Sequence, residues 1–436
     1  MLASEVPLER FAEPTFVVSG NAGLNHAHLE ALLTAAGMRK VPLERGAVVR
    51  FAWVELQETF QFDPVAYTVV TYVKNLFDDK KKRSCVSDKG ALHRVLQREF
   101  PEVAAAHLPA TCALDALDAD AVDWTQHMYI VRPTGPFAWC GKGIERATSA
   151  AELRRIQREK AGARDRPIAS EYIKHPLLWH GRKMHLRTYF LVRGRTEHSA
   201  FHATLWSRAK IMTAAKPYEC AHFDDSGIHD THVRSTPRGL FWPDDMRDAL
   251  SAAQIAHIQQ QMADVLACVA RVFEPLAAPY PESRWGFEVF GCDFMVDAAS
   301  LNVYLLECNE RVGYHLPPGD TDTSGRYARF TVDYYNWVYD NALAPMLQLP
   351  PRASFHLPSD TNPPPALESR GNPPLSSSSS SSSPSLTVPL VPLSAEASAE
   401  APVSTSVSAP AEAPAEAPAE TPSEASAEAL ASSSSS

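Results

Sequence analysis

The stretch GFEVFGCDFMVDAASLNVYLLECNER, residues 286–311, contains two runs rich in Phe, Val, Leu and Tyr on either side of a short polar segment. Such a pattern predicts two antiparallel strands joined as a hairpin. The same runs carry Asp293, Glu307 and Asn309. A carboxylate held away from water is unfavourable unless a partner compensates its charge. The hairpin therefore needs such a partner.

Asp293, Glu307 and Asn309 offer the oxygen ligands that Mg²⁺ prefers. Glu307 and Asn309 are two residues apart on one strand and therefore share a face. Asp293 joins that face only if the numbers of paired residues sum to an even number, which a loop of three or five residues after Asp297, or a β-bulge, provides. The hairpin predicts a site for Mg²⁺ on nucleotide phosphates; carboxylates at a solvated rim are the alternative.

A second stretch, RKMHLRTYFLV at residues 182–192, alternates cationic and apolar side chains. Period-two alternation places Lys183, His185 and Arg187 on one face of a strand and the apolar set on the other. The functional interpretation is a strand that binds anions, and the alternative is a solvated outer face.

A third stretch, YIVRPTGPFAWCGKGIERA at residues 129–147, predicts a strand that ends at Arg132 and a loop that contains Gly141 and Gly143. Glycines let backbone N–H groups approach a phosphate, and Arg132 can hold another phosphate oxygen. The loop matches neither the P-loop pattern nor the dinucleotide-binding fingerprint. Taken singly, it is typical of an ordinary surface loop.

Composition divides the chain near residue 349. Beyond it, Pro, Ser, Ala and Glu dominate and few apolar residues remain to offset chain entropy, so residues 349–436 are expected to be a disordered tail. The net charge is −10, of which −7 lies in residues 351–436, leaving −3 for the rest. This near balance argues against a dedicated nucleic-acid binder. Seven scattered cysteines and no apolar leader favour a soluble, cytoplasmic protein with no membrane span.

Helix and strand patterns alternate through the first 348 residues, which indicates an α/β fold. The expected parts are an N-terminal α/β domain at 1–80, a central lobe at 81–166 and a C-terminal lobe at 167–348. The last of these contains long helices near 247–274 and 327–347. A basic helix is expected from Ser87 (SDKGALHRVLQREF). In chain order, this helix, the Arg–Gly loop, the extended SEYI segment at 170–173, the cationic strand and the acidic hairpin describe an ATP site between two α/β lobes.

With these motifs assembled, residues 75–345 resemble the tubulin tyrosine ligase and tubulin tyrosine ligase-like family. NLFDDKKKRSCVSDKGAL resembles the family's N-x-F … K-x-x-L segment, and YIVRPTGPFAWCGKGI resembles its K-P … G-x-G-I loop. IASEYIKHPLLWHGRKMHLRTYFLV resembles its VxQxYIxxPLLxxGxKFDLRxYVLV core, and FGCDFMVDAASLNVYLLECN resembles its FGxDFMxD … LxExN metal hairpin. The last two motifs are specific.

This resemblance implies an ATP-grasp fold, with ATP and Mg²⁺ as cofactors. It places Arg187 near the γ-phosphate and the acyl-phosphate, and Lys210 roughly where the family has a further phosphate-binding Arg. It makes residues 171–173 the hinge beside adenine. The implied metal ligands are Asp293, Glu307 and Asn309, and the implied nucleotide-binding residues are Lys89, Arg132, Gly141, Gly143, Glu171, Tyr172, Ile173, Lys183 and His185.

Three positions depart from the family pattern. Arg132 stands where the family has Lys, which replaces a compact ammonium with a planar fork. His185 stands where the KFDLR motif has Asp. The family's HLTN segment occurs as HDTH, residues 229–232, with His232 in place of Asn. The groups expected to hold phosphates and metal therefore match better than the groups that complete the site.

The implied activity is ATP-dependent ligation of an amino acid to a carboxylate of an acidic protein tail, such as that of tubulin, through an acyl-phosphate. Glutamate, as in polyglutamylation, glycine and tyrosine are all compatible. A cytoplasmic monomer, associated with the cytoskeleton and without nucleic-acid or membrane partners, is expected. The alternative is a weak or inactive scaffold that binds nucleotide or tubulin, and a ligase acting on small peptides or ribosomal-protein tails is a third possibility.

Overall fold

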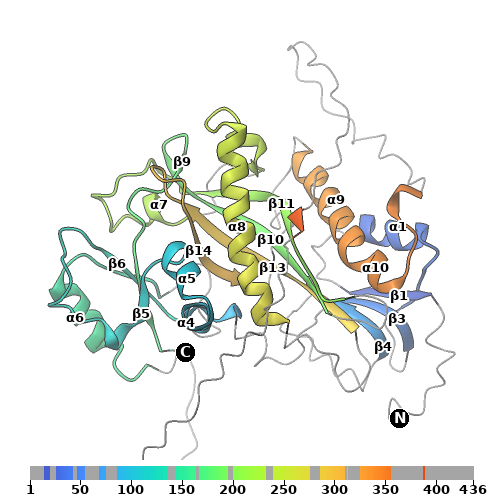
Figure 1. The fold of residues 1–436 in the computed structure, drawn as a ribbon, viewed down its shortest axis with the longest axis horizontal. Coiled ribbons are helices and arrows are strands. Elements are labelled where there is room, and N and C mark those ends of the chain that lie inside the picture. Colours follow the sequence, from blue (N-terminus) through green and yellow to red (C-terminus); the bar gives the residue numbers. More distant parts are fainter. Residues whose placement is uncertain are drawn as a thin grey trace, which may run out of the picture. The chain divides into compact units, whose positions relative to one another are not determined.

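The computed structural model describes residues 14–19, 26–42, 47–54, 68–74, 86–134, 143–163, 166–194, 200–231, 239–274, 285–309, 312, 325–354 and 386–387. All of these residues belong to one compact unit, Met1–Leu390. The mixture of helices and strands in Figure 1 confirms the predicted combination of α and β structure.

A large mixed sheet forms the centre of this unit. Its longest strands are β10 (Arg182–Arg193), β11 (His202–Thr213) and β13 (Trp285–Val296); β10 lies between the other two and is antiparallel to both. β13 also pairs with β14 (Val303–Asn309) and, in parallel, with β4. The other strands are β1 (Thr15–Ser19), β2 (Arg39–Lys40), β3 (Ala47–Val54), β4 (Thr68–Lys74), β9 (Leu178–Trp179), β12 (Phe241–Trp242) and β15 (Leu386–Thr387).

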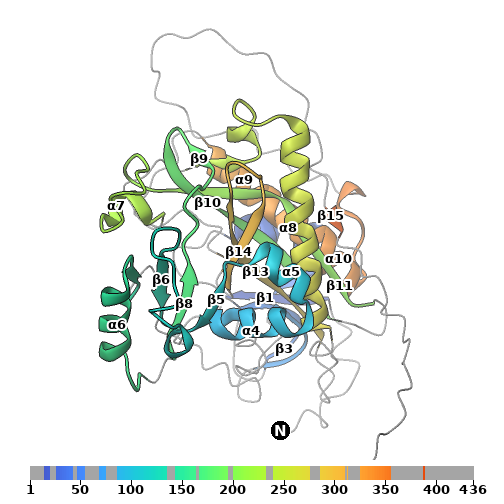
Figure 2. The same cartoon turned by 60° about the vertical axis from the view of Figure 1, so that its left-hand side comes forward.

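One face of the sheet packs against α8 (Ala252–Phe273), which runs across β10, β11 and β14 (Figure 1). The predicted alternation on β10 is confirmed, because Met184, Leu186, Phe190 and Val192 all lie in the core under α8. α8 begins after Ser251, which forms a capping box with Gln254 and so satisfies N–H groups of the first turn. Helices α4 (Lys89–Glu99) and α5 (Pro101–His107) pack into the same core (Figure 2).

The opposite face carries a second core, formed with α1 (Ala27–Ala35) and α9 (Arg326–Val338). Aromatic side chains dominate it: Tyr189 of β10 meets Trp206, Phe330 and Tyr334 edge-on or tilted. Because Lys183, His185 and Arg187 precede Tyr189 on the same face of β10, this face changes from a cationic surface to an aromatic core along one strand.

A smaller sheet stands apart, with strand order β5-β8-β6-β7. Its strands are β5 (Thr111–Ala113), β6 (Tyr129–Arg132), β7 (Glu145–Ala147) and β8 (Ile168–Glu171). Helix α6 (Ala150–Glu159) follows β7 and buries Leu153 and Ile156 in a third core. This sheet places Arg132 and Glu171 at the ends of neighbouring strands.

The helix predicted near 327–347 is interrupted, which corrects the sequence-based expectation. α9 passes into a π-helical segment, η5 (Tyr339–Leu343), before α10 (Ala344–Leu347). Pro345 has no N–H to donate to the carbonyl of Asn341 four residues earlier. Arg193 Nη1 donates to that carbonyl instead, at 3.0 Å.

The cores do not coincide with the predicted domain boundaries at residues 80, 166 and 348, which remain predictions. Strands β1 and β3 share a core with α9, and α4 shares one with α8. Most of the predicted disordered tail lies outside the described residues, apart from 349–354 and β15, which pairs with Thr204 and Leu205 of β11. Among the described helices, none combines the length and hydropathy needed to cross a membrane.

Candidate functional site

A pocket of about 280 Å³ opens between the small sheet and the cationic face of β10. Strands β6, β7 and β8 contribute one wall, and β10, β13 and β14 contribute the other. Nine of the residues expected to bind nucleotide or metal line it: Lys89, Arg132, Glu171, Tyr172, Ile173, Lys183, His185, Asp293 and Glu307. Tertiary structure thus brings together side chains that are up to 218 residues apart in the sequence.

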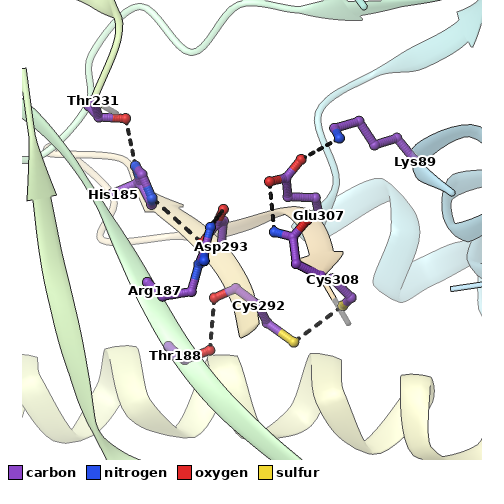
Figure 3. Close-up of polar contacts among 10 residues, drawn as sticks. Lys89, His185, Arg187, Thr188, Thr231, Cys292, Asp293, Glu307 and Cys308 are labelled. Carbon is purple, nitrogen blue, oxygen red and sulfur yellow. Dashed lines mark hydrogen bonds and ion pairs between the residues drawn. The ribbon is translucent and has the colours of Figure 1, made fainter. Parts of the chain in front are cut away.

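The hairpin meets its geometric requirement through a β-bulge. Val296 pairs with Val303 and Phe294 pairs with Leu305, but Asp293 then pairs with Glu307 because the register shifts between Asp293 and Phe294. Leu306 is the extra residue. The bulge turns Asp293 and Glu307 to the same face, as Figure 3 shows.

The neighbouring hairpin positions point the other way. Cys292 and Cys308 form the next cross-strand pair and are buried on the α8 side, with their Sγ atoms 3.3 Å apart. Asn309, opposite Gly291, returns to the face of Glu307, and its Nδ2 donates to Glu307 Oε1 at 2.8 Å. The three predicted metal ligands therefore project from one side of the ribbon.

The partner of the buried Asp293 carboxylate is a protein cation. Arg187, opposite Asp293 in the β10–β13 register, donates from Nε to Oδ1 and from Nη2 to Oδ2. His185 Nε2 lies 3.5 Å from Oδ1 (Figure 3). Burial opposes the charge, but Arg187 and His185 hold the pKa of Asp293 well below its ordinary value. Asp293 also raises the pKa of Arg187, so both groups stay ionised.

Glu307 has its own cation, Lys89, whose Nζ lies 2.6 Å from Glu307 Oε2. Lys89 is the first residue of α4, where the Asp88 side chain accepts a hydrogen bond from the Ala91 N–H and fixes the start of the helix. The helix thereby aims Lys89 at the hairpin (Figure 3). The family resemblance predicts that Lys89 belongs to the site, and the structure identifies Glu307 as its ion-pair partner.

The oxygen donors of the hairpin fit a magnesium ion chemically. Among the described residues no three His, Cys, Asp or Glu side chains form a cluster. Asp293 and Glu307 would supply two carboxylates, and Asn309, waters or phosphate oxygens would complete the coordination of Mg²⁺. In this structure Lys89 and Arg187 compensate the two carboxylates. A cation bound to Asp293 and Glu307 would therefore compete with these two side chains.

Arg132 and Lys183 line the pocket as buried cations. Arg132 Nη2 donates to Ser170 Oγ at 3.1 Å, and Nη1 lies 3.4 Å from the carbonyl oxygen of Leu306 in the bulge. Lys183 Nζ donates to the hydroxyl of Tyr172 at 3.0 Å. Burial lowers the pKa of both cations, for Lys183 to about 7. An arriving anion would favour the charged form of each.

Four predicted residues do not line this pocket. Arg187 contacts the pocket residue Asp293, and Asn309 contacts the pocket residue Glu307, but neither Arg187 nor Asn309 lines the pocket itself. Lys210 pairs with Arg187 across β10 and β11, and its Nζ lies 4.5 Å from the centre of the Tyr327 ring. Gly143 precedes the pocket residue Ile144 and has a φ of +74°, which favours glycine. Gly141 and His232 lie outside the described residues, and the binding roles of all predicted residues remain predictions.

Sequence reasoning missed several pocket residues. Arg146 of β7 lines the pocket and donates from Nη1 to the carbonyl of Phe223. His229, Asp230 and Thr231 line it too, and Thr231 Oγ1 is 2.6 Å from His185 Nδ1. A three-residue strand such as β7 is too short to show which face Arg146 takes. The HDTH segment was visible in the sequence, but its contact with His185 depends on tertiary structure.

His93, one turn after Lys89 on α4, is expected to make the fold sensitive to acid. It is 1% exposed and neither ring nitrogen has a hydrogen-bond partner. Burial and the nearby Arg132 lower its pKa from 6.5 to about 3. Because the unfolded chain binds a proton below about pH 6.5 and the folded protein does not, stability present above that pH is lost as the pH falls.

At pH 5 this one group contributes a loss of about 2 kcal/mol in the free energy of unfolding. We expect His93→Leu to reduce the difference in unfolding free energy between pH 7 and pH 5 by about that amount. Urea denaturation at the two pH values measures it. An equal acid sensitivity in the variant and the parent protein would contradict the role of His93.

Two comparisons with known proteins bear on this site. The model of the Tubulin-tyrosine ligase family matches residues 92–234, which contain Arg132, Lys183 and Arg187. A probable tubulin–tyrosine ligase of Schizosaccharomyces pombe is 25% identical over 189 residues, which cover 42% of this chain. The aligned part is 43% of that relative, so the chain spans less than half of its length. The resemblance inferred from the sequence motifs is confirmed.

Proposed function

We propose that this protein, similar over residues 92–234 to the Tubulin-tyrosine ligase family, is an ATP-dependent ligase that joins an amino acid to a carboxylate of an acidic protein tail. One observation carries the proposal: the cations Lys89, Arg132 and Lys183 line one pocket together with the carboxylates Asp293 and Glu307. This combination suits a polyphosphate bound with a divalent cation. The family similarity supports ATP-dependent ligase activity in general.

The two-sheet arrangement supports an ATP-grasp assignment. The small sheet β5-β8-β6-β7 covers the pocket from one side, and β10, β13 and β14 form the other. The segment Glu171–Ile173 begins at the last residue of β8 and leads from the small sheet towards the strands of the other wall. In this proposal the main chain of the segment reads the adenine ring, and the apolar side chains of Ile130, Met295 and Leu306 pack against it.

The cations of the pocket would position the triphosphate. Phosphoryl transfer depends mainly on alignment and charge stabilisation, with little covalent help from the protein. Arg132 and Lys183 are assigned to phosphate oxygens. Arg187 donates from Nε and Nη2 to Asp293 and does not itself line the pocket; by the family resemblance its Nη1 is assigned to the transferred phosphoryl group. Lys210, which lies opposite Arg187, is assigned to the reacting acyl-phosphate.

Asp293, Glu307 and Asn309 are assigned to Mg²⁺, which when bound neutralises charge on the phosphate oxygens. The protein's part is to keep the donors ionised and aligned. Arg187 does this for Asp293, because their bidentate contact holds the carboxylate in one orientation. Lys89 pairs with Glu307 until a cation replaces it.

In the proposed reaction, an acceptor carboxylate oxygen forms a bond to the γ-phosphorus and the bond to the β–γ bridging oxygen breaks, releasing ADP. The amine of the incoming amino acid then attacks the acyl carbon, and phosphate leaves as the amide forms. The amine proton passes to solvent or to a pocket base. Glutamate, glycine and tyrosine remain candidate donors, and a tubulin tail remains the candidate acceptor.

The decisive test is acceptor-dependent ADP formation by the full chain. Purified protein is incubated with Mg-ATP and each of glutamate, glycine and tyrosine, with tubulin or a synthetic acidic peptide as acceptor. A ligase releases ADP only when both co-substrates are present, and mass spectrometry shows one added residue on the acceptor. ADP release without acceptor modification would contradict ligation. The same assay on cell fractions tests the proposed cytoplasmic, cytoskeleton-associated location, and the elution volume of the purified chain in size-exclusion chromatography tests the proposed monomer.

A scaffold without turnover is the second candidate, and the ion pairs of the hairpin favour it. Both carboxylates expected to hold Mg²⁺ are already compensated by Arg187 and Lys89. Such a protein binds nucleotide or tubulin but releases no ADP with any acceptor. Isothermal titration with Mg-ATP, run beside the turnover assay, separates the two candidates.

His185→Asp distinguishes an adapted site from a degenerate one. His185 bonds to Thr231 through Nδ1 and lies near Asp293 through Nε2, so an aspartate there removes the imidazole and brings a second carboxylate into the neighbourhood of Asp293. We expect turnover to fall at least tenfold, about 1.4 kcal/mol in transition-state stabilisation. A large gain in turnover would instead mean that His185 impairs the native site. Thermal unfolding of the variant checks that the fold persists.

A further inference from the structure

Lys183 is a buried lysine that has no carboxylate partner among the described residues. It is 5% exposed, and its Nζ lies 3.0 Å from Tyr172 Oη and 4.3 Å from the centre of the Tyr172 ring. Within the described part of the chain, no carboxylate stands within ion-pair distance of Nζ. Removing an ammonium from water without an ionic partner favours release of its proton.

The hydrogen-bond chain beyond Lys183 has a defined direction. His229 Nε2 lies 2.9 Å from the carbonyl oxygen of His222, which can only accept, so Nε2 carries the proton. In the neutral ring Nδ1 then accepts from Tyr172 Oη, 2.7 Å away. Tyr172 is therefore a protonated phenol that accepts from Lys183. Burial raises the pKa of Tyr172 and lowers that of His229, in agreement with this pattern.

The hydrogen bonds that link Lys183, Tyr172 and His229 involve no negatively charged acceptor. Among the described residues, no carboxylate is in contact with Lys183. Burial is the main cause that lowers the pKa of Lys183 to about 7; Cys220 and Asp230 oppose it, and Arg146 adds to it. The titratable groups that line this part of the pocket or act on the charge of Lys183 come from β7, the end of β8, β10 and the chain around α7 (Ser226–His229): Arg146, Glu171, Tyr172, His185, Cys220, His229 and Asp230. Tyr218 lies edge-on to His229.

We propose that Lys183, held in position by Tyr172 and His229 but buried without an ionic partner among the described residues, loses its proton in the nucleotide-free pocket and regains one when a polyphosphate binds. The inference rests on the proposed function only for the identity of the ligand, a magnesium nucleotide. A phosphate oxygen beside Nζ favours the ammonium form, so binding and protonation strengthen each other. Tyr172 and His229 act as positioning residues.

The affinity of the pocket for a polyphosphate should depend on pH. Because the ligand raises the pKa of Lys183, affinity is greatest below about pH 7 and falls as the pH rises. With the bound-state pKa back near the ordinary lysine value of about 10.4, the dissociation constant should rise about eightfold between pH 7.5 and pH 8.5. At pH 8.0 about 0.9 proton should be taken up for each nucleotide bound.

Isothermal titration calorimetry on the full chain measures this uptake directly. The probe is the magnesium complex of a non-hydrolysable ATP analogue, titrated at pH 8.0 in buffers of different ionisation enthalpy. The slope of binding enthalpy against buffer enthalpy gives the number of protons. Lys183→Arg, which stays charged, should bind with no uptake at this site and a flatter pH profile. Lys216→Arg, at a lysine side chain that is 58% exposed, is the matched control and should keep the parent slope.

Tyr172→Phe tests the positioning role. The variant keeps the ring but removes the hydroxyl that accepts from Nζ, so the ammonium loses a partner. The pH at which affinity begins to fall should move to a lower value. A purely structural role for Tyr172 would weaken binding equally at every pH and leave that midpoint unchanged.

Labelling of the parent protein provides a second measurement that needs no variant. Pyridoxal phosphate, followed by borohydride reduction, forms a bond between an unprotonated amine and the aldehyde carbon, with water lost and the imine reduced. Peptide mapping should show labelling of Lys183 that rises with a midpoint near pH 7 and is blocked by the nucleotide analogue.

The outcomes separate the two proposals. Nucleotide binding with the same enthalpy in every buffer overturns the inference and leaves the proposed nucleotide site intact. Uptake that persists in Lys183→Arg, or a labelling midpoint near that of an ordinary lysine, also overturns it. No nucleotide binding in any buffer overturns the proposed function, and the inference with it.

Discussion

An Asp293→Ala variant is expected to lose about 3–5 kcal/mol in the free energy of unfolding, because it leaves the Arg187 guanidinium without its carboxylate. Asp293 is 2% exposed and Arg187 donates two hydrogen bonds to it. The side chain of Arg187 is 13% exposed, so water compensates its charge poorly. Removing one member of such a pair is far more damaging than the net value of the pair suggests.

Denaturation of the full chain by urea measures this loss. The double variant Asp293→Leu/Arg187→Met removes both charges and should regain much of the stability, although it is expected to have no activity. A single Asp293→Ala variant as stable as the parent protein would mean that solvent reaches Arg187. In the parent protein, the Asp293 carboxylate could then bind a metal ion without leaving the charge of Arg187 uncompensated.

A Glu307→Gln variant is expected to reduce turnover at least a hundredfold, about 2.7 kcal/mol in transition-state stabilisation, with little change in stability. The substitution keeps the shape of the side chain and removes its charge from the proposed metal site. It also releases Lys89, whose Nζ lies 2.6 Å from Glu307 Oε2. The two side chains are 15% and 16% exposed, so the lost pair is less damaging than that of Asp293.

Turnover is measured as acceptor-dependent ADP formation, beside thermal unfolding of the same samples. Glu30→Gln is a matched control, because Glu30 of α1 is also 2.6 Å from a lysine, Lys40, in a different part of the structure. It should leave turnover unchanged. A normal rate in Glu307→Gln would contradict the metal assignment, and a normal rate with unaltered nucleotide affinity would remove Glu307 from the site altogether.

The strands that carry the site were predictable because alternation is a local property. The faces of β10 follow from the sequence, since Lys183, His185 and Arg187 alternate with Met184 and Leu186. The hairpin was predictable for the same reason. Its register was left conditional, and the bulge at Leu306 met the condition. No feature of the amino-acid sequence identifies Leu306 as the bulged residue.

Other parts of the site depend on chain segments that are distant in sequence. Arg146 could not be assigned because β7 has only three residues, and its contact, the carbonyl of Phe223, is 77 residues away. The break after α9 arises from Pro345, yet its consequence for Asn341 depends on Arg193, 148 residues earlier. Local patterns cannot report such contacts.

The sequence by itself determined the types of residue at the site, the strand faces that present them and the similarity to the Tubulin-tyrosine ligase family. Only the tertiary structure decided which charge compensates which: Arg187 for Asp293, Lys89 for Glu307, and for Lys183 a phenol rather than a carboxylate. The physical reason is that side-chain spacing along a strand is set by the backbone, whereas ion pairing depends on distances of a few ångströms between strands and helices that meet only in the folded chain.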